Sequence, residues 1–171
     1  ANVIEALAEH AQAARGALAD NTVRALRADS ALFTTWCADH GHRALPAEPA
    51  TVAAFLDDMG STRAPATVRR YLASIAHLHR AAQLADPTKA ELVRLAVKRI
   101  ARAKGSRQRQ ATGITRQVAD QLLDAAGDRV IDRRDRALLL TMRDLLARRS
   151  EIVALDVADV TFAQDGTATV L

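Results

Sequence analysis

The sequence predicts a mainly α-helical protein, an N-terminal helical bundle followed by a shorter part that ends in a β-hairpin. Apolar residues recur at helical spacing almost everywhere before residue 155. Beyond that point, Val160-Thr161-Phe162 and Ala168-Thr169-Val170-Leu171 flank Asp165-Gly166, the pattern of two strands joined by a tight turn. Residues 104–110 are basic and contain no apolar residue, which predicts a linker between two domains.

Five helices are predicted before the linker. The first extends to about Ala19, the second ends at Gly41, the third ends at Gly60, the fourth begins at Pro65, and the fifth follows Asp86-Pro87. Phe33 and Trp36 lie on the apolar face of the second helix, so we expect them in the core. The fifth helix carries the apolar residues Leu92, Leu95 and Ile100.

The second part of the chain repeats the helical pattern before its hairpin. Thr115 is expected to cap a helix that ends at Gly127. A longer helix over about 131–146 contains Ala137-Leu138-Leu139-Leu140, which predicts burial on most of its sides. A short helix is expected near Ser150–Ala154. Because the chain stops inside the second strand of a hairpin, and a lone hairpin is marginally stable, we expect this domain to be unfinished.

The composition excludes several classes of protein. Of 171 residues, 49% are hydrophobic and 26% are charged, which predicts a folded, soluble chain rather than a disordered one. The single cysteine, Cys37, excludes an intramolecular disulfide and a cysteine-based zinc site. No run of 18 apolar residues is present, so we expect no membrane span and a cytoplasmic location. His77 and His79 do not share a helix face, and no metal site is expected.

Positive charge is concentrated in the middle third of the chain. Residues 61–110 hold 12 Lys and Arg against 2 Asp and Glu, whereas residues 1–60 carry a net charge of −4 and residues 111–171 a net charge of −2. Toward and within the linker, the basic residues are Lys98, Arg99, Arg102, Lys104, Arg107 and Arg109. A basic linker can wrap a duplex and neutralise several phosphates, so a polyanion is the first partner to consider. A solubilising surface is the alternative.

Basic and hydroxyl side chains gather at the beginning of two predicted helices. The second helix carries Thr22, Arg24 and Arg27 in its first two turns. In and beside the fourth helix, the polar residues away from the apolar face are Arg63, Thr67, Arg69, Arg70, Ser74 and His77. Proteins that read the major groove present helix ends in this way, with amides and Thr on phosphates and Arg on phosphates or guanine edges. An ordinary solvated face is the alternative.

A second group of candidate residues follows the long helix of the second part. Arg148 comes directly after that helix, so we expect its guanidinium to be partly desolvated beside Glu151. A desolvated guanidinium with a forked geometry suits a phosphate oxyanion. A structural Arg–Glu pair is the alternative.

These stretches together resemble the tyrosine recombinase (phage integrase) family. Arg133–Leu140 and Leu146–Leu155 resemble the start of its catalytic domain, which shows an Arg-Asp motif, a buried helix and then Leu-Arg-x-Ser-Glu-Leu-x-x-Leu. Ala147 departs from this pattern, where the family commonly has Leu. The stretches similar to the family's core-binding domain are Asn21–Arg24, Leu45–Ala47, Ala66–Leu72 and Leu78–Arg80. The resemblance covers the chain from about residue 2.

The resemblance implies a division of the chain and a role for each candidate residue. Residues 1–103 would form a SAM-like helical DNA-binding domain, 104–111 a basic linker, and 112–171 the truncated start of a mixed α/β catalytic domain. Arg148 would be the first catalytic arginine, on the scissile phosphate, and Glu151 the acidic residue that orients active-site groups. The residues matching DNA-facing positions are Thr22, Arg24, Arg27, Thr67, Arg70 and Tyr71.

The family also implies a mechanism and partners. Its nucleophilic tyrosine forms a 3′-phosphotyrosyl link to DNA that conserves the phosphodiester bond energy, so no cofactor is expected. Complete members act on double-stranded DNA as homotetramers on paired sites, which implies association with the nucleoid. The family's Lys, His-x-x-Arg and Tyr are missing, since the last lysine here is Lys104, the last histidine His79 and the one tyrosine Tyr71. We therefore expect this chain to be inactive alone.

Two other functions remain open from the sequence. The same helical domain would serve a non-catalytic DNA-binding regulator or accessory protein. A helical protein-interaction module is a further alternative, and it would show no salt-sensitive affinity for DNA.

Overall fold

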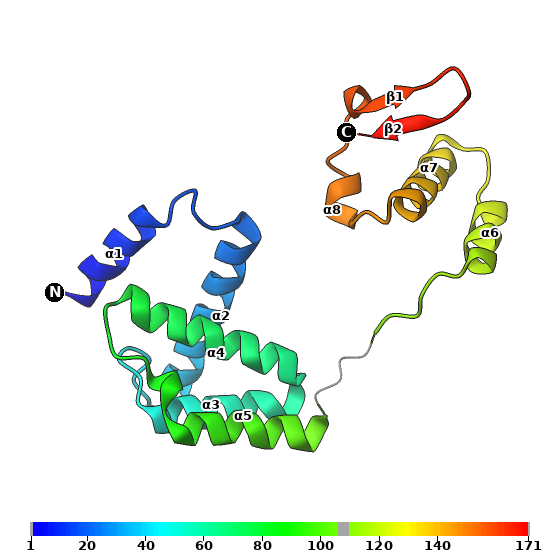
Figure 1. Cartoon of the computed structure of the whole chain (residues 1–171). Coiled ribbons are helices and arrows are strands. Elements are labelled where there is room, and N and C mark those ends of the chain that lie inside the picture. The colour runs from blue at the N-terminus through cyan, green and yellow to red at the C-terminus, as the bar shows by residue number, and fades with distance from the viewer. Residues whose placement is uncertain (1, 106–109, 171) are drawn as a thin grey trace. The chain divides into compact units, whose positions relative to one another are not determined.

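The computed structural model describes residues 2–105 and 110–170. The chain divides into two compact units, Ala1–Arg109 and Gln110–Leu171, called unit 1 and unit 2 below (Figure 1). Helices dominate both units, so the prediction of a mainly α-helical protein is confirmed. Within the described ranges, none of the helices combines the length and apolar character that a membrane crossing needs.

In its described part, unit 1 has helices and loops and no strand. Its elements in chain order are α1 (Val3–Ala13), α2 (Asp20–Asp39), α3 (Pro49–Thr62), α4 (Pro65–Ala81), the 3₁₀ turn η1 (Pro87–Lys89) and α5 (Glu91–Lys104). Pro49 and Pro65 each occupy the first turn of a helix, where the missing N–H has no intrahelical acceptor to lose. The first helix ends earlier than the expected Ala19 because the chain turns at Gly16, whose φ of 72° favours glycine.

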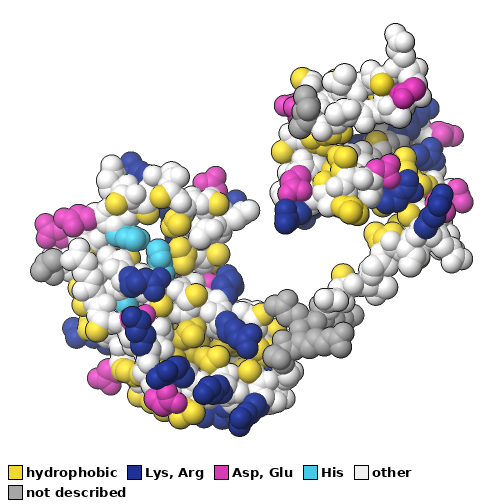
Figure 2. Space-filling view, viewed as in Figure 1, with side chains coloured by type: hydrophobic (Ala, Val, Ile, Leu, Met, Phe, Trp, Pro, Cys, Tyr) yellow, Lys and Arg dark blue, Asp and Glu magenta, His cyan; other side chains and the backbone are white. Residues whose placement is uncertain are grey.

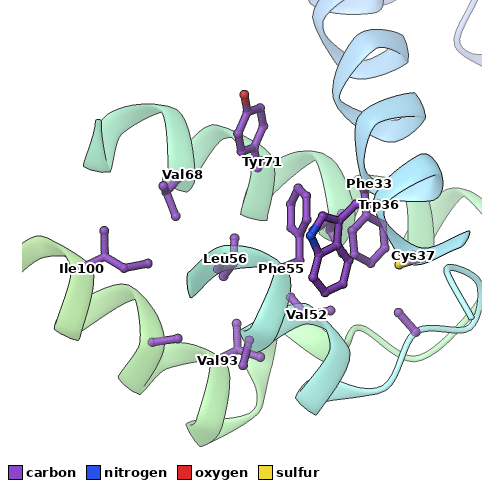
Figure 3. Close-up of a cluster of buried hydrophobic side chains, with 14 residues drawn as sticks. Phe33, Trp36, Cys37, Val52, Phe55, Leu56, Val68, Tyr71, Val93 and Ile100 are labelled. Carbon is purple, nitrogen blue, oxygen red and sulfur yellow. The ribbon is translucent and has the colours of Figure 1, made fainter. Parts of the chain in front are cut away.

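The core of unit 1 forms where α2, α3, α4 and α5 meet (Figure 3). Phe55 is fully buried, and its ring lies 5.0 Å from that of Phe33 and 5.5 Å from that of Trp36, measured between centroids. Trp36 is 9% exposed and donates from Nε1 to the Asp58 carboxylate at 2.7 Å. The expected burial of Phe33 and Trp36 is therefore confirmed, and Cys37 beside them is buried as well.

The packing of α3 on α5 explains one departure from the expectation and decides which face of α5 is buried. Gly60 does not end α3, which continues to Thr62. A Cβ atom at Gly60 would lie 2.8 Å from the side chain of Ile100, so the glycine is needed for the close approach of the two helices. On α5 the buried residues are Val93, Ala96 and Ile100, whereas Leu92 and Leu95 are about half exposed. Both sets of residues match helical spacing. The face that contains the small Ala96 is the one that packs against α3.

His79 has a structural role in this unit. Its ring is fully buried, Nε2 accepts the backbone N–H of Ala47 at 3.0 Å, and Nδ1 bonds the Ile75 carbonyl at 2.8 Å. These two bonds require a neutral ring with its proton on Nδ1. The side chain thereby ties α4 to the segment that leads into α3.

In its described part, unit 2 contains helices followed by a β-hairpin. They are α6 (Arg116–Ala125), α7 (Val130–Leu145), α8 (Arg149–Ile152), the 3₁₀ turn η2 (Val157–Asp159), β1 (Val160–Phe162) and β2 (Ala168–Val170). Thr115 caps α6 by accepting the N–H of Val118, as expected. The strands pair antiparallel, with Val160 opposite Val170, and Gly166 turns the chain at a φ of 84°. The predicted hairpin is confirmed.

The expected burial of the long helix in unit 2 is wrong. No residue of α7 is buried, and Leu138, Leu139 and Leu140 are only half-buried. Several apolar side chains elsewhere in this unit are also largely exposed, including Val157 at 91% and Phe162 at 77%. Two short helices and a two-stranded sheet cannot cover all sides of a four-turn helix.

Candidate nucleic-acid interface

The beginning of α2 presents a basic surface. Thr22, Arg24 and Arg27 are all exposed, while Val23 and Leu26 between them are half-buried on the side that packs against the unit. The structure records no ion pair for either arginine among the described residues. Figure 2 shows several Lys and Arg side chains on the visible face of unit 1.

The beginning of α4 brings three more arginines to the surface of unit 1. Arg63, in the C-cap of α3, and Arg69 are exposed. Arg70 keeps 49% of its side chain exposed, and Thr67 is half-buried in the first turn. The helix α4 packs against α2, so both predicted basic faces lie on helices that contact each other in unit 1.

A buried carboxylate that the sequence analysis missed links these two helices. Asp29 of α2 is 3% exposed, and its Oδ1 lies 2.9 Å from Nη1 of Arg70. Its Oδ2 accepts the hydroxyl of Ser74 at 2.8 Å. Ser74 is therefore buried, and the expectation that it lies on the polar surface is wrong, because its hydroxyl is needed to satisfy Asp29. The available signal was an acidic residue on the face that carries Phe33 and Trp36.

Tyr71 lies in the core rather than on the surface. It is 6% exposed, and its ring centroid is 5.9 Å from that of Phe55. The guanidinium carbon of Arg70 lies 5.3 Å from the Tyr71 ring centroid. The Tyr71 ring thus lies against the guanidinium of Arg70.

The basic residues toward the linker have different surroundings. Lys104 donates from Nζ to the carbonyl oxygens of Ser61 at 2.8 Å and Arg63 at 3.0 Å, which are near the end of α3. Arg99 pairs with Asp57. Arg107 and Arg109 lie outside the described residues.

Arg148 and Glu151 form a pair at the beginning of α8. Nη1 of Arg148 donates to Oε1 of Glu151 at 2.8 Å, and the backbone N–H of Arg148 donates to Oε2 at 2.7 Å. These bonds, the backbone one first, lower the pKa of Glu151 below its usual value. The expected partial desolvation of Arg148 is wrong, since its side chain is 83% exposed. The half-buried α7 and the four-residue α8 leave it open to solvent.

No metal site accompanies these residues. Among the described residues, the structure holds no group of three or more His, Cys, Asp or Glu side chains placed to bind a metal ion.

Comparison with known proteins gives one informative match. No protein-family model matches the chain. Over 152 residues it is 34% identical to a protein of Selenomonas ruminantium described as an integrase/recombinase xerD homolog. This similarity supports the resemblance to the tyrosine recombinase family. The match covers 86% of this chain and 45% of the relative, so the chain spans about half the length of the curated relative it matches.

Proposed function

We propose that this chain is the DNA-binding part of a site-specific recombinase, followed by the start of its catalytic domain. The complete protein would integrate or recombine DNA by cleaving and rejoining strands through a 3′-phosphotyrosyl intermediate. The similarity to the integrase/recombinase of Selenomonas ruminantium carries this proposal. The share of that relative left unmatched supports the view that catalytic residues lie beyond the matched region.

The proposed division assigns residues 1–103 to a SAM-like core-binding domain, 104–111 to a linker and 112–171 to the catalytic domain. Apolar residues of unit 2, such as Val157 and Phe162, are largely exposed. Their exposure supports the proposal that other parts of the complete protein pack over them.

The proposed DNA contacts lie on the basic helix ends of unit 1. Thr22, Arg24 and Arg27 of α2 are exposed and would contact the phosphate backbone, together with Arg63, Thr67, Arg69 and Arg70 around the start of α4. Arg107 and Arg109 would add phosphate contacts from the linker. Tyr71 is left out of this surface because its ring belongs to the core.

Arg148 and Glu151 would supply the first part of the catalytic site. The bond from Nη1 to Glu151 fixes one edge of the Arg148 guanidinium and leaves its other N–H groups for the non-bridging oxygens of the scissile phosphate. Glu151 would act by orienting this cation. No nucleotide cofactor is needed, because the phosphotyrosyl bond retains the energy of the phosphodiester. The complete protein would act as a homotetramer on paired duplex sites in the nucleoid.

Affinity for duplex DNA is expected to fall steeply as salt rises. With three or four phosphates neutralised, the logarithm of the binding constant should fall against the logarithm of salt with a slope of about −3. Fluorescence anisotropy with a labelled duplex measures this slope. The double variant Arg24→Glu, Arg27→Glu should bind more weakly and with a shallower slope.

The matched control is Arg94→Glu on α5, where an exposed arginine pairs with Glu91. Arg70→Glu is a poorer choice, because it would place a second carboxylate beside buried Asp29 and disturb folding. A slope near zero, unchanged in the double variant, would contradict the proposal and favour a protein-interaction module.

A further inference from the structure

We infer that Asp29 is a positioning residue that sets the direction in which Arg70 meets DNA. The inference rests on the proposed function, because it concerns the same surface. Asp29 would thereby assist the binding of an anion, although its own negative charge repels anions.

The side chain of Asp29 is held in one orientation. Its carboxylate is 3% exposed, and both oxygens are occupied by α4, Oδ1 by Arg70 at 2.9 Å and Oδ2 by Ser74 at 2.8 Å. The two partners lie one turn apart on α4, and Ser74 is 45 residues from Asp29 in the sequence. A buried carboxylate held by two bonds cannot rotate without leaving a polar atom unsatisfied.

This arrangement fixes Arg70 while leaving it accessible. The guanidinium is a rigid plane, so holding Nη1 against Asp29 sets the direction of the remaining N–H groups. The ring of Tyr71, 5.3 Å from Cζ, limits the position of the same plane. About half of the Arg70 side chain is still exposed. An arginine ordered before binding loses less conformational entropy when it contacts a phosphate or a guanine edge.

Charge and positioning predict opposite results for Asp29→Asn. The substitution removes one negative charge beside the interface, which by electrostatics alone would strengthen DNA binding. If Asp29 positions Arg70, the same substitution should weaken binding by up to about tenfold, because a neutral amide oxygen holds the guanidinium less firmly than a carboxylate and the arginine contact loses its orientation. The sign of the change therefore separates a positioning role from a purely structural pair.

The experiment measures the dissociation constant of the full chain for a labelled mixed-sequence duplex, with circular dichroism and thermal midpoints recorded for each variant. The variants are Asp29→Asn, Arg70→Lys, their combination and the control Arg94→Lys. Arg70→Lys keeps the charge and the partner of Asp29 but loses the oriented fork, so it should also weaken binding by about tenfold. The double variant should be no weaker than either single variant, since both remove one coupled contact.

Two results would overturn the inference while the proposed function survives. One is wild-type or tighter binding by Asp29→Asn in a folded protein. The other is unchanged binding by Arg70→Lys, which decides the question even where Asp29→Asn fails to fold. Absence of duplex binding by the unmodified chain would instead overturn the proposed function.

Discussion

Phe55→Ala is expected to lower the free energy of unfolding of unit 1 by about 3–5 kcal/mol, the usual cost of removing a buried phenyl ring. Phe55 is fully buried and packs against rings from two other helices, Phe33 and Trp36 of α2 and Tyr71 of α4. The loss of this ring would leave a cavity where α2, α3 and α4 meet. Denaturant unfolding followed by circular dichroism measures the change.

The matched control for Phe55→Ala is Leu95→Ala on α5. Leu95 is 48% exposed, so its truncation should cost about 0.5 kcal/mol. A loss below about 1 kcal/mol for Phe55→Ala, or equal losses for the two variants, would show that the core is not centred on Phe55.

The chain is expected to form no covalent bond with DNA. Its one tyrosine, Tyr71, is 6% exposed, and its ring packs on Phe55 in the core of unit 1, so we expect it to have a structural role and not to act as a nucleophile. Incubation with nicked duplex DNA, followed by denaturing electrophoresis, tests for a protein–DNA adduct. An adduct that is lost in Tyr71→Phe would contradict this account of the chain as a binding part without a nucleophile.

The sequence predicted the elements better than their buried faces. Helical spacing located α2 and its core residues Phe33 and Trp36, because aromatic side chains on one stripe have few alternatives to burial. On α5, more than one set of apolar residues fits helical spacing. Only the contact of α5 with α3 at Gly60 decides that Val93, Ala96 and Ile100 are the buried set. The burial of Leu138–Leu140 depends on how much of the chain packs over α7. The local spacing of apolar residues carries no information about that.

The candidate site was predictable to different degrees. Arg148 and Glu151 are three residues apart at a helix start, so their pairing follows from local geometry. The contacts of Asp29 with Arg70 and Ser74 join two helices, and no local pattern pairs residues 45 positions apart. The basic helix starts of α2 and α4 were visible from the sequence because exposure there follows from the opposite apolar face.

The most direct test of the account is to map duplex DNA onto unit 1 by backbone amide chemical shifts. The largest changes are expected at Thr22, Arg24 and Arg27 on α2 and at Thr67 and Arg70 on α4. Salt should reverse these changes, because they come from phosphate contacts. Changes gathered instead around the exposed leucines of α5, or no changes at all, would contradict the claim that this chain binds DNA through the basic residues of α2 and α4.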